Sequence, residues 1–175
     1  MSGHHPDEPF RPTRRAAVLT VAAMAAPSLV PSAARAADAC GEAARQAAFS
    51  IHDRYVAIAN SRAPERMREV CAEDYIQHSG RSPSGIAAQI ENFRQILARW
   101  PDLVVHVDDR VFGDGKLVAR NTFMATHSRT VLGVAPTGRK VSFRTIDIWR
   151  VADGKFAEHW DIVDFAGLEK QLRGT

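Results

Sequence analysis

Apolar residues in the first half of the chain recur with the period of an α-helix. Between residues 40 and 60 one face of a predicted helix carries Ala48, Ile51, Tyr55 and Ile58. Between residues 82 and 100 they recur at steps of three and four, and this segment opens with Ser-Pro and stops before a proline. Residues 61–71 include Pro64 near a helix start. The pattern therefore predicts three helices, over 40–60, 61–71 and 82–100.

From residue 103 onward the pattern changes to strict alternation, which is typical of half-buried strands. It predicts four strands over 103–112, 116–128, 140–151 and 155–165, and a shorter strand within 73–80. Asp-Gly turns join the first pair and the last pair of the four as hairpins. Helices followed by an antiparallel meander indicate an α+β fold, in which a curved antiparallel sheet wraps around the N-terminal helices as a cone-shaped barrel with a pocket at its wide end.

The first 36 residues read as a targeting segment. Thr13-Arg14-Arg15 precedes a mildly apolar run over 16–30, and Ala34-Arg35-Ala36 follows. These features predict a cleaved twin-arginine signal peptide. The apolar run is too short to cross a bilayer comfortably, which argues against a membrane-spanning helix. A disordered or anchoring segment is the alternative. Cleavage after Ala36 or Ala39 would leave one exported domain over residues 40–175, periplasmic or secreted and with no membrane attachment.

The charge balance argues against a nucleic-acid partner. The net charge is +3, and without the first 36 residues it is about +1, from 19 basic and 18 acidic residues. We find no basic stripe with interleaved aromatic residues, so binding to nucleic acid is not expected. A disulfide between the only cysteines, Cys40 and Cys71, is possible in an oxidising compartment. No Cys/His cluster has metal-ligand spacing, so a metal site is not expected.

The last hairpin decides which side chains share a face. A two-residue Asp-Gly turn would place Asp147 across from Trp160, whereas a three-residue Ala-Asp-Gly turn would place Asp147 across from His159 and Thr145 across from Asp161. We favour the three-residue turn, because it gathers acids and aromatic residues on one face, as a ligand pocket requires. This predicted pocket face carries Phe143, Thr145, Asp147, Trp149, His159, Asp161 and Val163.

The opposite face of the same two strands is too apolar to meet water. It carries Ile146, Ile148, Trp160 and Ile162 beside Arg144, Arg150 and Glu158. A homodimer that packs through this outer face of the sheet would cover the apolar area.

Several sequence motifs occur together and resemble those of one known family. They are "YIQHSG", the Gly-x-Ala-Pro-Thr-Gly-Arg of 133–139, "DIWRVADGKFAEHWDIVD" and the terminal "LEKQL". The chain resembles the SnoaL-like polyketide cyclase and ester cyclase family of the nuclear-transport-factor-2-like superfamily over about residues 42–172. The resemblance implies a cone-shaped α+β barrel whose pocket works without a metal or organic cofactor. It also implies that an acid at the position of Asp161 serves as general acid/base in an intramolecular aldol ring closure.

Asp161 is therefore the first candidate for catalysis. A carboxylate among apolar walls loses hydration, which favours uptake of a proton from an activated carbon. Asp147 or His159 could hold Asp161 in place or share its proton. The alternative is that Asp161 caps a strand end or pairs with an arginine. The resemblance places His78 at the pocket mouth as a partner for a substrate carbonyl, and a surface or core role is its alternative.

The remaining candidates are substrate-binding residues. Tyr75 and Trp149 are expected in the pocket wall with Phe143 and Thr145, and Trp100 is expected in the core. Arg120 is a candidate to face the cavity, and a surface role is the alternative. Epoxide hydrolases of the superfamily carry an Arg-x-Asp arrangement on the corresponding strand. This chain has Arg120-Asn121-Thr122 instead, which argues against epoxide hydrolysis.

Two functions remain open from the sequence. The first is an exported SnoaL-like enzyme that carries out cofactor-independent acid/base cyclisation or isomerisation of a small hydrophobic carbonyl compound. The second is a non-catalytic periplasmic protein of the same fold that binds small molecules or assists another protein. The superfamily contains ketosteroid isomerases, epoxide hydrolases and many binding proteins, so the fold alone does not decide between them.

Overall fold

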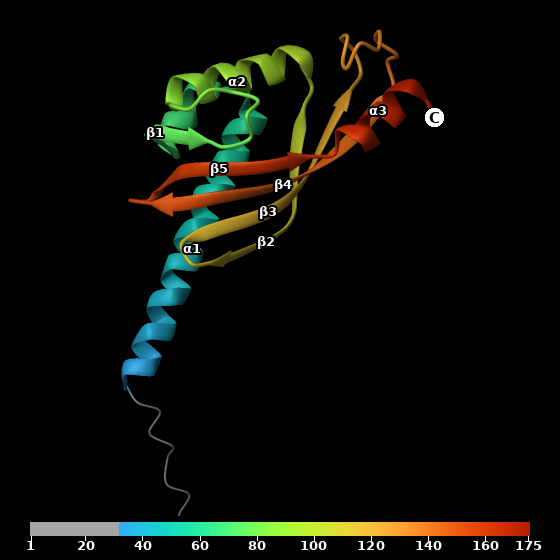
Figure 1. The fold of residues 1–175 in the computed structure, drawn as a ribbon. Helices are drawn as coiled ribbons and strands as arrows, with labels where there is room; N and C mark the ends of the chain where they lie inside the picture. Colours follow the sequence, from blue (N-terminus) through green and yellow to red (C-terminus); the bar gives the residue numbers. More distant parts are fainter. Residues whose placement is uncertain (1–31) are drawn as a thin grey trace, which may run out of the picture.

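The fold combines helices with one curved sheet, as Figure 1 shows. The structure is a computed structural model that describes the backbone of residues 32–175 and the side chains of residues 41–175. Most of the predicted signal peptide, residues 1–31, lies outside the described residues. The elements in chain order are α1 (Ser32–Ser61), η1 (Pro64–Glu69), β1 (Cys71–Gln77), α2 (Ile86–Arg99), β2 (Val104–Gly113), β3 (Lys116–Thr126), β4 (Lys140–Ala152), β5 (Lys155–Val163) and α3 (Phe165–Arg173).

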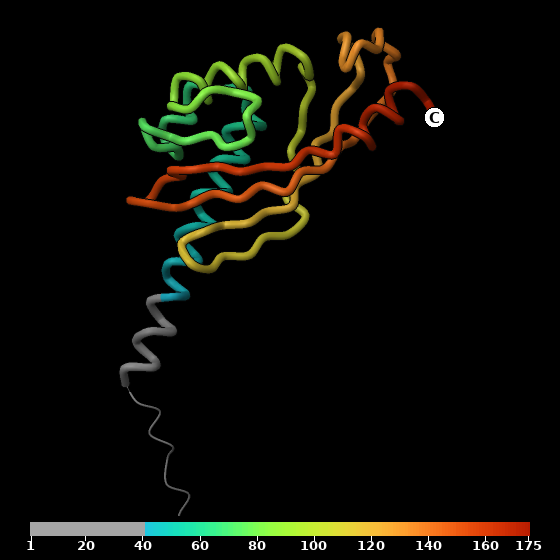
Figure 2. The backbone as a smooth tube through the Cα atoms, viewed as in Figure 1, coloured from blue at the N-terminus to red at the C-terminus, as the bar shows by residue number. Residues whose placement is uncertain are grey.

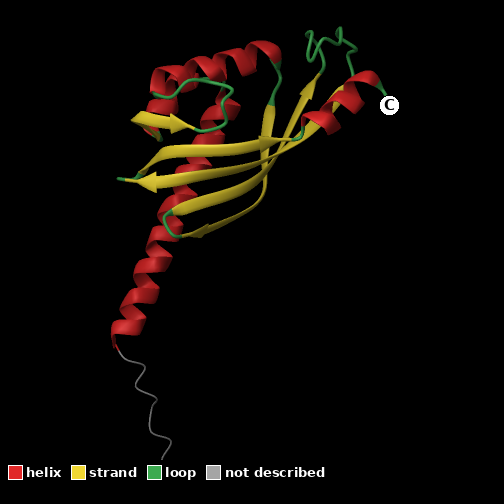
Figure 3. Cartoon of the chain, viewed as in Figure 1, coloured by secondary structure: helices red, strands yellow, loops and turns green. Residues whose placement is uncertain are grey.

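The sheet has five strands in the order β1-β5-β4-β3-β2. The long strands β2 to β5 form an antiparallel meander, and the short β1 adds to β5 in parallel. Figure 3 shows how these strands curve, with the helices gathered at one side and one end. The predicted α+β class is confirmed, and so are the four long strands.

The helices supply the apolar side chains that fill the concave side of the sheet. In α1 the buried residues include the predicted face, Ala48, Ile51, Tyr55 and Ile58. The Tyr55 ring lies 5.3 Å from Trp149 of β4 and 5.7 Å from Phe93 of α2, measured between ring centroids. Burying an aromatic or branched side chain of this size stabilises a fold by roughly 1.5–3 kcal/mol. Figure 2 shows the backbone of α1 running across the sheet.

The segment before the sheet is less helical than its pattern predicts. Residues 61–71 form only a short 3-10 helix, η1, and Cys71 already pairs with Phe156 in the sheet. Helix α2 begins at Ile86 and not at Ser82, because Gly85 adopts φ +95°, a backbone conformation that a helix does not contain. Residues 78–85 are therefore a loop, and this loop reaches the pocket described below.

Cys71 is a buried free thiol in this structure. Burial raises the pKa of the thiol to about 12, so the folded protein keeps it protonated. The side chain of Cys40 lies outside the described residues, and the predicted disulfide stays a prediction.

The β4–β5 hairpin differs from its prediction in one informative way. Asp153 and Gly154 have φ of 48° and 70°, and Ala152 pairs with Lys155, so the turn is the two-residue form and the predicted three-residue turn was wrong. A bulge between Arg150 and Val151 then shifts the register by one residue.

The bulge restores the predicted faces but changes the partners across the strands. Asp147 lies across from Asp161, and Trp149 lies across from His159. Phe143, Thr145, Asp147, His159, Asp161 and Val163 therefore share the concave face, as predicted. The pairs across the two strands are displaced by two residues, so that Thr145 pairs with Val163 and not with Asp161. Asp147 does not lie across from Trp160, which pairs with Ile148.

No helix among the described residues is long and apolar enough to cross a membrane.

Candidate active site

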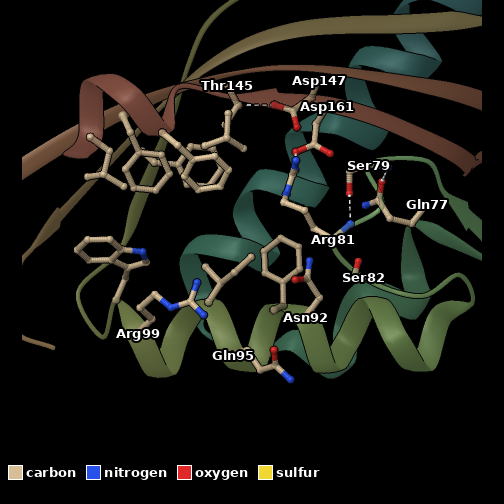
Figure 4. Close-up of a pocket in the computed structure, with 18 of the residues that line it drawn as sticks. Gln77, Ser79, Arg81, Ser82, Asn92, Gln95, Arg99, Thr145, Asp147 and Asp161 are labelled. Carbon is tan, nitrogen blue, oxygen red and sulfur yellow. Dashed lines mark hydrogen bonds and ion pairs between the residues drawn. The ribbon is translucent and has the colours of Figure 1, made fainter. Parts of the chain in front are cut away.

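A cavity of about 470 Å³ opens between the concave face of β4 and β5, helix α2, the loop 78–85 and the start of α3. Its volume falls in the range of small-molecule sites. One end is aromatic and is lined by Phe93, Trp100, Phe123 and Phe143. The other end is polar and is lined by Gln77, Arg81, Thr145, Asp147, His159 and Asp161. Figure 4 shows the acids and Arg81 gathered at this polar end, with Arg99 at the other.

Asp147 is the most fully hydrogen-bonded acid of the pocket. Its Oδ2 accepts hydrogen bonds from Asn121 Nδ2 at 2.9 Å and from the Thr145 hydroxyl, and its Oδ1 lies 3.0 Å from His159 Nε2. The side chain is only 9% exposed. A buried carboxylate with three donors is held firmly in one orientation.

The hydrogen bonds around His159 fix its tautomer. Gln77 Oε1 accepts from the backbone N–H of Ser79, so the Gln77 amide nitrogen faces His159 Nδ1 at 2.9 Å. Nδ1 must therefore accept this hydrogen bond, and the ring proton is on Nε2, where it is donated to Asp147. The imidazole of His159 on β5 thus links β1, through Gln77, to β4, through Asp147.

Asp161 lies directly across from Asp147 and has a different environment. Its side chain is 7% exposed, and its Oδ2 pairs with a guanidinium nitrogen of Arg81. Its Oδ1 is buried and has no hydrogen-bond partner among the described residues. Asp161 therefore lines the pocket and keeps one buried oxygen that no described residue hydrogen-bonds.

Four predicted site residues do not line this pocket. His78 lies on the outer face of the sheet, where its Nε2 is 2.8 Å from Glu158 and its ring stacks on Trp160 at 4.3 Å. Arg120 also points outward, toward Asp108 and Asp109. The physical reason is strand parity, because β3 buries Leu117, Ala119 and Asn121, so the even-numbered residues between them face outward.

Tyr75 and Trp149 lie in the core beneath the pocket and do not form its wall. Both are almost fully buried, at 0% and 1% exposure. The Trp149 ring stacks on the His159 ring at 4.9 Å, and the Tyr75 ring lies 6.3 Å from it. Burial raises the pKa of the Tyr75 phenol well above its usual range, so this side chain stays neutral. Their place in the structure is to support the imidazole from behind.

Sequence reasoning missed Gln77 and Arg81, which line the polar end, and Asn121, which donates a hydrogen bond to Asp147. Gln77 and Asn121 face the concave side by strand parity, and this signal was available. Arg81 gave no signal, because it comes from a loop whose path no periodicity predicts. Within the residues that the structure describes, no group of three or more His, Cys, Asp or Glu side chains is placed to hold a metal ion.

A curved sheet wrapped around helices, with acids and aromatic residues lining a cavity on its concave side, defines the nuclear-transport-factor-2-like class of pocket proteins. Residues 50–172 match the family of SnoaL-like polyketide cyclases, so the chain belongs to that family. Membership supports a cyclase or isomerase role that needs no cofactor.

Solved structures agree with this assignment. TsrD from Streptomyces laurentii is 30% identical, with a TM-score of 0.69, over 75% of this chain and 98% of its own. IdmH from Streptomyces antibioticus is 27% identical, with a TM-score of 0.64, over 73% of this chain and 98% of its own. A SnoaL-like polyketide cyclase from Agrobacterium tumefaciens, at 23% identity and a TM-score of 0.63 over 70% of this chain and 94% of its own, supports the fold alone. The comparison with curated proteins gave no match.

Proposed function

We propose that the protein is an acid/base cyclase or isomerase in which Asp161 moves a proton between a carbon and an oxygen of a small hydrophobic carbonyl compound. The observation that carries this proposal is Oδ1 of Asp161, a buried oxygen without a hydrogen-bond partner among the described residues, at the polar end of a cavity whose other end carries four aromatic rings. Such an oxygen is placed to receive a proton from a bound molecule.

The two facing carboxylates support a division of roles. Asp147 already accepts from Asn121, Thr145 and His159, so a further proton would break an existing hydrogen bond. Among the described residues Asp161 has a single partner, Arg81, and it can take a proton on its other oxygen without such a loss. In this assignment Asp161 is the acid/base, and Asp147 is a positioning residue that holds His159.

The chemistry balances without an added group. Asp161 Oδ1 takes a proton from the carbon beside a substrate carbonyl, and the electron pair of the broken C–H bond forms an enolate. The enolate carbon attacks a second carbonyl carbon of the same molecule, which forms the C–C bond of a ring and leaves an alkoxide. Asp161 returns its proton to that alkoxide. Phe93, Trp100, Phe123 and Phe143 would hold the apolar body of the substrate.

A simple ketone tests the first step. We expect the protein to accelerate exchange of the α-hydrogens of 2-tetralone, a bicyclic aryl ketone, in D₂O followed by NMR. In Asp161→Asn this acceleration should fall by about 100-fold or more, which is the usual contribution of a general base. Asp109→Asn is the matched control, because Asp109 is exposed on the outer face.

Two results would count against the proposal. Full exchange activity in Asp161→Asn would exclude Asp161 as the base. Binding of 2-tetralone with no exchange above that in buffer, in the parent protein and the variant alike, would favour the alternative of a non-catalytic binding protein.

We also propose that the outer face of the sheet forms a homodimer contact. Ile146 and Ile162 are 52% and 74% exposed on this face, which is unusual for isoleucines on neighbouring strands. Light scattering on the purified protein should give the mass of a dimer, and Ile162→Asp should give a monomer. Ala57→Asp, at an exposed position on α1, should leave the dimer intact. A monomer in the parent protein would end this proposal.

Export remains the third proposal, supported by the Arg14-Arg15 pair and the Ala34-Arg35-Ala36 segment. Expression in a bacterium with a twin-arginine pathway should give a periplasmic product whose mass corresponds to a start at residue 37 or 40. Changing both arginines to lysine should leave the full-length chain in the cytoplasm. An uncleaved chain in both cases would contradict the proposal.

A further inference from the structure

We propose that Arg81 is the electrostatic partner of the substrate oxygen in this pocket, pairing with Asp161 while the site is empty and stabilising the enolate once Asp161 has taken the proton. This inference rests on the proposed function, because it assumes that Asp161 is the base. It assigns a second catalytic residue to the site, from a loop outside the sheet.

The position of Arg81 places its guanidinium at the pocket mouth. The residue belongs to the loop 78–85 and lines the cavity, and its side chain is 41% exposed, whereas that of Asp161 is 7% exposed. The guanidinium carbon also lies 5.8 Å from the centre of the Phe165 ring, which belongs to α3 and lines the same cavity. Arg81 therefore stands between solvent and the acid, and Figure 4 shows its side chain directed at Asp161.

The loop that carries Arg81 is fixed at its base. The backbone N–H of Gln77 donates to Ser84 Oγ at 3.1 Å, and the backbone N–H of Gly85 donates to the carbonyl of Tyr75 at 2.5 Å. Inside the loop, the N–H of Ser79 donates to Gln77 Oε1 at 3.1 Å. The same Gln77 side chain donates to His159, so the loop and the acid end of the pocket are held by one residue. A cation on such a base is preorganised for a charge that develops nearby.

The charges at the polar end show why a cation is needed there. Two carboxylates, Asp147 and Asp161, face each other, and among the residues whose side chains the structure describes Arg81 is the arginine or lysine that contacts this pair. When Asp161 Oδ1 takes the substrate proton, Asp161 becomes neutral and Arg81 loses its anion. The negative charge is now on the enolate oxygen of the substrate. Arg81 can pair with that oxygen, so the site holds the same number of charges before and after the step.

Both oxygens of Asp161 fit this sequence. Arg81 contacts Oδ2, and Oδ1 has no partner among the described residues, so proton uptake does not require the ion pair to break first. The planar guanidinium has several N–H donors and can contact Asp161 and a substrate oxygen together, which a lysine ammonium does less well. This geometry selects substrates whose reacting carbonyl oxygen reaches the mouth beside Phe165 while the apolar body lies toward Trp100.

The test uses 2-naphthol as a stable analogue of the 2-tetralone enolate. Absorbance distinguishes bound naphthol from bound naphtholate, so a pH titration gives the preference of the site for the anion. We expect the parent protein to favour naphtholate by about 10-fold or more, as for a hydrogen bond to a charged group, and Arg81→Gln to lose this preference. Arg81→Lys should keep part of it.

Two further variants sharpen the result. Asp161→Asn should bind naphtholate more tightly than the parent protein, because Arg81 no longer has a competing anion, while exchange of 2-tetralone is lost. Arg94→Gln is the control, since Arg94 lies on α2 outside the pocket and pairs with Glu65 and Glu91. In Arg81→Gln, exchange of 2-tetralone should fall by about 100-fold, as when one donor to a developing oxyanion is removed.

Each result separates this inference from the proposed function. Exchange that depends on Asp161 but not on Arg81 would overturn the role of Arg81 and keep the base. A naphtholate preference that depends on Arg81, without any exchange, would support Arg81 as the anion partner and overturn the proposed function. An unchanged naphtholate preference in Arg81→Gln would overturn the inference directly.

Discussion

Two pairs of histidine and carboxylate lie on opposite faces of the sheet at β5, and their distances are nearly equal. Inside the pocket, His159 Nε2 is 3.0 Å from Asp147, and the two side chains are 7% and 9% exposed. On the outer face, His78 Nε2 is 2.8 Å from Glu158, and the side chains are 35% and 20% exposed. A distance alone would rank the pairs as equivalent.

Their surroundings make the pairs different. The inner pair is joined to Asn121 and Thr145, which donate to Asp147, and to Gln77, which donates to His159. Asn121 and Thr145 would each be left with a buried donor without its acceptor if the Asp147 carboxylate were replaced. Glu158 also binds Arg150, and water reaches the outer pair. Burial therefore decides which pair the fold depends on, because solvent can replace a lost partner only on the outer face.

The largest expected effect tests this difference with two substitutions that preserve shape. Asp147→Asn should lower the free energy of unfolding by about 3–5 kcal/mol, because the donors of Asn121, Thr145 and His159 lose a charged acceptor and each such buried hydrogen bond contributes about 1.5–3 kcal/mol. Glu158→Gln should change it far less, because the outer pair is solvated. Urea unfolding followed by circular dichroism measures both. Equal losses in the two variants would show that burial does not separate the pairs.

A third histidine extends the comparison to a buried ring beside a cation. His52 is fully buried in α1, and its Nδ1 lies 3.4 Å from Arg110. Burial, and then the charge of Arg110, lower the pKa of His52 from 6.5 to about 4. Between these values the unfolded chain binds more protons than the folded one, so stability falls as the pH drops from about 6.5 to about 4.

The expected loss over that interval is roughly 3 kcal/mol, from about 1.4 kcal/mol for each pH unit between the two pKa values. His52→Gln should flatten this part of the profile of unfolding free energy against pH. His106→Gln is the control, because His106 is an exposed histidine on β2. A profile of the same slope in His52→Gln would assign the acid sensitivity to other groups.

The smallest expected effect belongs to the outer pair. Hydrogen bonding to His78, and then to Arg150, holds the pKa of the Glu158 carboxyl below its usual range. Glu158 therefore stabilises the fold above its unfolded pKa, and this contribution is lost as the pH falls through the folded value. His78→Ala should raise the pKa of Glu158 toward its usual range, measured by carboxyl-carbon NMR, with little change in unfolding. An unmoved pKa would show that Arg150 alone is responsible.

Alternation in the sequence was sufficient to predict the two faces of β4 and β5 but not their register. Phe143, Thr145, Asp147, His159 and Asp161 line one cavity, as their shared parity predicts. The pairing of Asp147 with Asp161 depends on a bulge at Arg150, which no residue pattern marks. Parity also fails where its phase is misjudged: Arg120 is the predicted cavity residue of β3, but its neighbour Asn121 is the one buried on the concave side, where it contacts Asp147.

The sequence by itself determined the α+β class, the long strands and the acid and aromatic character of the concave face, because these follow from local periodicity and turn chemistry. Only the tertiary structure decided which groups touch. It brought Arg81, from a loop 80 positions away, onto Asp161, and it placed His78 outside the pocket. Contacts of this kind depend on loop paths and on one bulge, and they join residues whose separation in sequence leaves no periodic signal.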